Sequence, residues 1–122
     1  MSLRAASNNT ASASVNLTGK TASISSTSLL TGAAAGVYRA TVDLITTAVG
    51  TAGTVTATIT SNNGTMSPSQ TTGALSLSAT GELSATFTLY SAANQSINYS
   101  TTLAGATGSP QYAMRIRLEY LG

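Results

Sequence analysis

The chain contains no cysteine, no histidine and no tryptophan. Without cysteine it has no disulfides, and without cysteine and histidine it has none of the usual zinc and copper ligands, no Ser-His-Asp triad and no Cys-His dyad. No apolar run approaches the roughly 18 residues of a membrane-spanning helix. We therefore expect no membrane partner and no enzyme that works through those groups.

Carboxylates are nearly as scarce, since the chain has only Asp43, Glu82 and Glu119. A glycosidase needs two carboxylates that face each other across a substrate, and a calcium site usually draws on several acids close together. These three acids are far apart in the sequence. Asp43 and Glu119 lie near arginines, which favours surface ion pairs, and Glu82 follows a glycine in a predicted turn. We expect no catalytic residues, no metal site and no cofactor.

Five basic residues give the chain a formal net charge of +2. Nucleic-acid binding usually needs clustered lysines and arginines that contact several phosphates. Arg4, Lys20 and Arg39 are scattered, and only Arg115 and Arg117 lie close together in the sequence. This distribution predicts no nucleic-acid partner.

Small residues dominate what is present. Ser and Thr together number 40 of the 122 residues and Ala adds 20, whereas Leu, Ile, Val and Phe together number 23. Small side chains bury little apolar area, and burial stabilises a fold by about 25 cal/mol per Å². Such a core is thin, so we expect subunits to bury further apolar surface in an oligomer.

Alternation with a period of two predicts strands that have one buried face. It is clearest at residues 36–46, where Tyr38, Val42 and Leu44 alternate with Arg39 and Asp43. Further apolar rows occur at residues 15–17, 22–30, 53–60, 74–79, 83–89, 97–103 and 111–121. No amphipathic helix is present, and turn signals recur at about 8–12 residues. The sequence therefore predicts an all-β fold, an antiparallel β-sandwich of about eight strands that is jelly-roll-like.

Residues 1–12 are small and polar, and we interpret them as a flexible N-terminal arm that attaches the chain to an assembly. Residues 13–122 contain no internal linker and have the length of one domain. We therefore predict a single β-sandwich domain over residues 13–122.

Charges on two predicted strands are candidate interface residues. Arg115, Arg117 and Glu119 share the outer face of residues 111–121, and Arg39 and Asp43 share that of residues 36–46. Arginine makes directional hydrogen bonds across interfaces. We predict that these side chains form a subunit or particle interface and control pairing at the edges of the sheets.

The tyrosines divide into two groups. Tyr38, Tyr99, Tyr112 and Tyr120 fall in apolar rows, which favours packing in a core or interface. Tyr90 is out of phase with the apolar row of residues 83–89. It is therefore the tyrosine that we expect to make an exposed contact.

Two stretches of the chain carry a recognisable pattern. Residues 36–39 read GVYR, residues 97–102 read INYSTT, and the last predicted strand contains PQY at 110–112 and RLE at 117–119. These elements resemble small β-sandwich proteins encoded among the virion structural genes of tailed bacteriophages and prophages. The resemblance covers about two-thirds of the chain. It implies a non-enzymatic virion component, commonly trimeric, and brings no catalytic residues with it.

From this resemblance and the composition we expect a capsid decoration or head-fibre protein that assembles as a homotrimer. Its partners are then other copies of itself and major capsid or tail proteins, and its location is the virion, assembled in the host cytoplasm. The alternative is a receptor- or carbohydrate-binding module of a tail fibre or adhesin. In that case the loops at residues 62–64 and 104–109 contact a host surface glycan.

Overall fold

The computed structural model describes residues 12–122, so the predicted arm lies outside the described residues except for Ser12. The described residues form nine strands and no helix, and hence no helix able to span a membrane. The strands are β1 (Ala13–Lys20), β2 (Ile24–Leu30), β3 (Gly36–Ala48), β4 (Ala52–Thr60), β5 (Ser69–Thr71), β6 (Leu75–Ser76), β7 (Glu82–Ser91), β8 (Ile97–Thr107) and β9 (Gln111–Tyr120).

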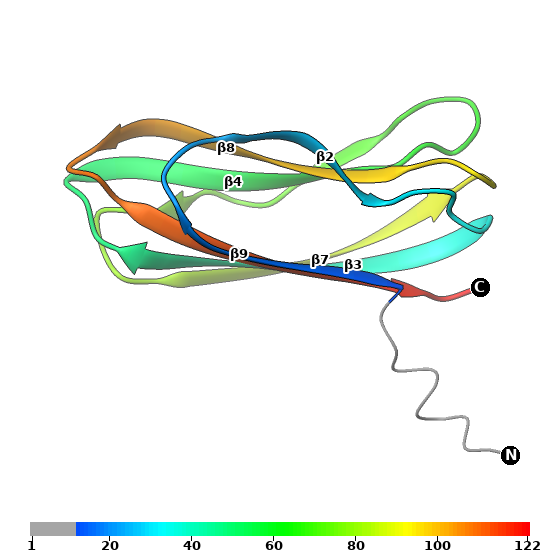
Figure 1. Cartoon of the computed structure of the whole chain (residues 1–122), viewed down its shortest axis with the longest axis horizontal. Coiled ribbons are helices and arrows are strands. Elements are labelled where there is room, and N and C mark those ends of the chain that lie inside the picture. Colours follow the sequence, from blue (N-terminus) through cyan, green and yellow to red (C-terminus); the bar gives the residue numbers. More distant parts are fainter. Residues whose placement is uncertain (1–11) are drawn as a thin grey trace, which may run out of the picture.

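The strands form two antiparallel sheets that are stacked face to face (Figure 1). One sheet has the order β1-β9-β3-β7 and the other the order β2-β8-β4-β5, with β6 also paired to β4. Apart from β6, this is the eight-strand arrangement of a jelly roll. The predicted all-β, jelly-roll-like sandwich is therefore confirmed.

The sequence did not predict β5, which has three polar residues and no apolar alternation. Its pairing with β4 includes hydroxyl contacts of 2.9 Å between Thr58 and Thr71 and between Thr60 and Ser69. β5 thus forms a strand through its pairing with β4, and its own three residues do not predict one.

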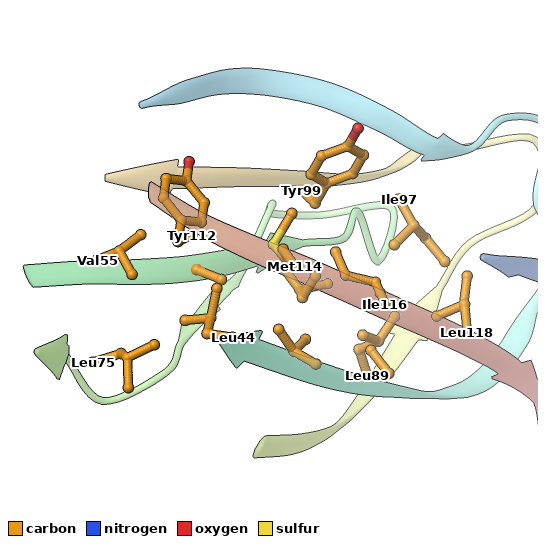
Figure 2. Packing of buried hydrophobic residues seen from close by; sticks show 14 of the residues in the cluster. Leu44, Val55, Leu75, Leu89, Ile97, Tyr99, Tyr112, Met114, Ile116 and Leu118 are labelled. Atoms are coloured by element: carbon orange, nitrogen blue, oxygen red, sulfur yellow. The ribbon is translucent and has the colours of Figure 1, made fainter. Parts of the chain in front are cut away.

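The core lies between the two sheets and consists of the apolar rows that the alternation identifies. In the ladder of β3 and β9, Val42 is paired with Ile116 and Leu44 with Met114, and all four side chains are buried. Figure 2 shows side chains of this ladder pointing toward the opposite sheet, from which Ile97 of β8 points back toward them. Tyr99 of β8 and Val55 of β4 belong to the same buried cluster. Toward the edges of the sheets the apolar side chains are only half-buried, Leu17 on β1 and Leu83 on β7 among them.

Tyr112 joins three elements through its hydroxyl group. The ring is completely buried, and the hydroxyl donates to the backbone carbonyl of Ala22 at 2.7 Å and bonds Thr101 Oγ1 at 2.6 Å. Thr101 Oγ1 also accepts the backbone N–H of Ile24 at 2.9 Å. This network ties β9 to β8 of the other sheet and to the start of β2.

Tyr120 departs from the expectation of a buried row, because its side chain is 46% exposed. It lies at the end of the sandwich, where its ring packs against Tyr38 with a centroid separation of 5.0 Å. The Tyr120 hydroxyl donates to the carbonyl of Ala35 at 2.9 Å. Gly36 accommodates this contact, because a Cβ there would lie 2.7 Å from the Tyr120 ring and its φ of +148° favours glycine.

Replacing Tyr112 by Phe is expected to lower the free energy of unfolding by about 1–2 kcal/mol, since it removes the buried hydroxyl from both partners. Tyr90→Phe is the matched control and should change it by less than about 0.5 kcal/mol, because Tyr90 is 49% exposed. Urea unfolding of both variants measures the difference. Equal effects would contradict the role of the Tyr112 network.

Alkaline pH is expected to destabilise the fold through the buried tyrosines. Burial raises the pKa of Tyr112 above its ordinary value of 10.0, and burial and the nearby Tyr120 raise the pKa of Tyr38. The folded chain then holds these protons more tightly than the unfolded chain, so stability is lost as the pH rises above 10. Urea unfolding at successive pH values should show this fall, and Tyr112→Phe should make it shallower.

Candidate functional site

Six of the eight charged residues of the chain lie on the outer face of the four-stranded sheet. Alternation points every second residue of β3, β7 and β9 away from the core. These outward positions hold all three carboxylates of the chain and three of its five basic residues. We name this surface the charged face and define it by Arg39, Asp43, Glu82, Arg115, Arg117 and Glu119.

The register of β3 and β9 sorts the charges into rows across the sheet. Arg39 is paired with Glu119, and Asp43 is paired with Arg115. Between these two rows, Thr41 is paired with Arg117. Each charged residue of β3 therefore faces a residue of opposite charge on β9.

Glu119 is held by two arginines. Arg39 donates from Nε and Nη2 to Glu119 Oε1 at 3.1 and 3.0 Å, and Arg117 Nε lies 3.9 Å from Glu119 Oε2. The Glu119 side chain is 15% exposed, whereas those of Arg39 and Arg117 are 47% and 49% exposed. The carboxylate is thus enclosed, and both guanidinium groups retain a solvent-facing side.

The other end of the charged face is more loosely paired. Asp43 Oδ1 accepts a hydrogen bond from the hydroxyl of Ser84 on β7. Arg115 Nη2 lies 4.0 Å from Glu82 Oε2, and both side chains are more than half exposed. Glu82, expected in a turn, is the first residue of β7.

A shallow depression of about 330 Å³ lies in this face, where small side chains stand between the arginines. Ser14 and Asn16 of β1 and Thr41 and Asp43 of β3 line it together with Arg115 and Arg117. The depression brings uncharged hydrogen-bonding side chains together with one carboxylate and two guanidinium groups.

Tyr90, predicted to be exposed, lies on the same face and is 49% exposed. Its cross-strand neighbour on β3 is Val37, whose carbonyl accepts the backbone N–H of Leu121 at 2.7 Å. Leu121 is 51% exposed. An apolar row therefore adjoins the row of Arg39 and Glu119 at this end of the sheet.

The opposite surface, formed by β2, β8, β4 and β5, has a different character. Its outward positions on β4 and β8 hold threonine, serine, asparagine and alanine, and within residues 12–122 none is charged. We name this surface the threonine face. The sandwich thus has one charged surface and one uncharged polar surface.

One expectation about position is wrong. β3 and β9 are the inner strands of their sheet, so Arg39, Asp43, Arg115 and Arg117 lie on its face and cannot guard its edges. Strand order decides this, and alternation alone carries no information about strand order.

The two loops that the carbohydrate-binding alternative names lie at opposite ends of the sandwich. In the ladder of β4 and β8, Thr60 is paired with Asn98, and Ala52 is paired with Thr107. The loop at residues 62–64 follows one end of this ladder, and the β8–β9 turn lies at the other. Residues 104–107 are themselves part of β8.

Comparison with known proteins supplies no family. No protein-family model matches the chain, and no curated protein matches it. Among solved structures, that of the Eiger TNF from S. frugiperda is similar, with a TM-score of 0.47 and 10% sequence identity over 93% of this chain and 94% of that chain. A likeness at this level carries no information about function.

Within the described residues no group of three or more acidic side chains is placed to hold a metal ion. What the charged face provides is a set of ion pairs with partly exposed arginines, an adjoining apolar row and a shallow depression. The sequence alone points to five of the six residues that define the charged face, and to Tyr90 beside them, but not to Glu82, Val37, Leu121, Ser14 or Asn16. Their contribution depends on the ladder register, which only the fold shows.

Glu119→Gln is expected to lower the free energy of unfolding by about 0.5–1 kcal/mol, because it removes the charge held by two arginines. Glu82→Gln is the control and should have almost no effect, since its pair with Arg115 is long and exposed. Urea unfolding of both variants, in low salt and in 1 M NaCl, measures the two effects. At 1 M NaCl the Debye screening length is about 3 Å, so exposed charges interact only weakly. An effect of Glu119→Gln that salt does not reduce would contradict an electrostatic origin.

Proposed function

We propose that this chain is a non-enzymatic structural component of a bacteriophage virion, a capsid decoration or head-fibre type protein that assembles as a homotrimer. The assignment to a virion rests on the resemblance of residues 36–46 and 97–122 to phage virion proteins. Jelly-roll domains are common in viral capsids, which agrees with this reading. The charged face has partly exposed arginines in ion pairs, and a structural subunit can use such groups to contact its neighbours.

The proposed oligomer is supported mainly by the edge of the sheet at β7, where apolar side chains are incompletely covered. Leu83 and Phe87 point toward the core but are only partly buried there. Burial of such side chains against another subunit adds the apolar contact that the thin core lacks.

The backbone of β7 is also open to a partner. Its pairing with β3 is unbroken over ten residue pairs, whereas the pairing of β1, the other edge strand, shifts register between Leu17 and Lys20. β7 contains no proline, lysine or bulge, the features that usually protect edge strands. Gln70 of β5 donates from Nε2 to the carbonyl of Thr88 at 2.8 Å, so this one carbonyl of β7 already has a partner within the chain. We infer that the trimer contact includes the edge of β7.

Native mass spectrometry of the purified chain should give a mass near three times 12.1 kDa. Leu83→Lys should abolish the trimer, because a charge is placed at the half-buried edge. Leu17→Lys is the matched control on β1, also half-buried at a sheet edge, and should remain trimeric. A wild-type monomer at micromolar concentration, or equal behaviour of the two variants, would contradict the contact.

The virion assignment is tested on particles. Purified virions from a phage that encodes this chain should contain it in stoichiometric amounts, and a particle reconstruction should place its density on the capsid or at a fibre. Absence of the chain from purified virions would overturn the assignment. Specific binding on a glycan array, with the chain absent from particles, would favour the carbohydrate-binding alternative.

A further inference from the structure

We propose that the charged face binds the charged face of a second copy of this chain, about a two-fold axis that runs parallel to the strands between β3 and β9. The contact is separate from the β7 edge. In an assembly that also contains the trimer, it joins a subunit of one trimer to a subunit of another. It requires neither the trimer nor the virion.

The pairing of charges across β3 and β9 makes this face complementary to itself. A two-fold axis between these strands keeps each row in place and exchanges the two strands, so a β3 residue of one copy lies over the β9 residue of the same row in the other. Arg39 then lies over the row of Glu119 of the second copy, whose carboxylate is only 15% exposed, and Asp43 faces Arg115 of the second copy. The same contacts are made in reverse, so each row contributes twice.

The remaining rows agree with the same axis. Thr41, which is uncharged, lies over Arg117 of the second copy. At one end of the face Val37 lies over Leu121, and at the other end Ile45 lies over Ala113, because these are also paired across β3 and β9. Apolar side chains thus meet at the end of Val37 and Leu121, whereas Ala113 is itself buried. No like charges meet between β3 and β9.

Geometry and exposure permit the contact. Four strands about 4.8 Å apart and nine residues long, at about 3.3 Å per residue, present roughly 570 Å² per copy, or about 1,100 Å² for the pair. This is at the lower limit of specific interfaces, about 1,000 Å² in total. The side chains of Arg39, Arg115 and Arg117 are 47%, 52% and 49% exposed, so each has a face on which a second copy can bond.

The threonine face provides the contrast. Its outward positions within residues 12–122 carry no charge, so it has no electrostatic pattern by which to select an orientation. Thr56 and Thr102 are cross-strand neighbours there, as Asp43 and Arg115 are on the charged face. They therefore supply a matched control for the test.

The test exchanges charges between copies. Asp43→Arg places two arginines in one row, and Arg115→Asp places two aspartates there, so each variant alone repels its own kind. Each should lose self-association by about tenfold or more in sedimentation equilibrium at 50 mM NaCl. When the two variants are mixed, both contacts in the row become attractive, and the hetero-pair should regain the wild-type affinity.

Co-purification of a tagged variant with an untagged one reads out the same exchange. Tagged Asp43→Arg should retain more untagged Arg115→Asp than untagged Asp43→Arg. Retention of the like variant measures subunit exchange within trimers and is the baseline for this comparison. Thr56→Arg and Thr102→Asp on the threonine face should show no such preference. The preference should weaken in 500 mM NaCl because the charges are screened.

Equal retention of like and unlike variants would overturn the proposal, as would an absence of salt-sensitive association in the wild type. If either charge-reversed variant fails to fold, Thr41→Glu and Thr41→Arg decide the question. Thr41→Glu places a carboxylate opposite Arg117 of the second copy and should tighten association several-fold, whereas Thr41→Arg should weaken it. Trimer mass and particle content are measured independently, so failure here leaves the proposed function standing or falling on its own tests.

Discussion

The antiparallel pairing of β3 with β9 is the constraint on which the rest of the structure depends. It brings residues 36–48 beside residues 111–120 at the centre of one sheet, and one register sets both faces. On the inner face it aligns Val42 with Ile116 and Leu44 with Met114, which fill the middle of the core. On the outer face it aligns Arg39 with Glu119 and Asp43 with Arg115. A shift by one residue would send the charges into the core and the leucines into water, so the register is strongly specified.

Much of this fold could be predicted from the sequence, because its strands alternate cleanly. The apolar rows around Tyr38, Leu89, Ile97 and Tyr112 are the rows that the structure buries. β5 could not be predicted, since its three polar residues carry no alternation. Tyr120 follows the pattern but is half exposed, and it is the last residue of β9.

The charged face illustrates a different limit. Most of its residues were identified as outward-facing, but their convergence depends on strand order. Arg39 and Glu119 are 80 positions apart, and nothing in either segment reveals that they are neighbours. Few charges on a large Thr-rich surface would ordinarily provide only solubility. Because the fold gathers all the carboxylates onto one side, the same few charges form an ordered pattern on which recognition can act.

The strand order also governs when the molecule can form. β1 has β9 as its partner, and β2 has β8, so the early strands of this sandwich pair only with strands that follow them much later in the chain. During translation, β3 can pair with β7 before β9 has left the ribosome, which leaves one side of β3 unpaired. Pairing between such distant segments is slow and leaves unpaired strands open to other chains. The scarcity of large apolar residues leaves the core of the folded sandwich thin. Before the strands pair, the same scarcity means that the chain exposes little apolar surface to other chains.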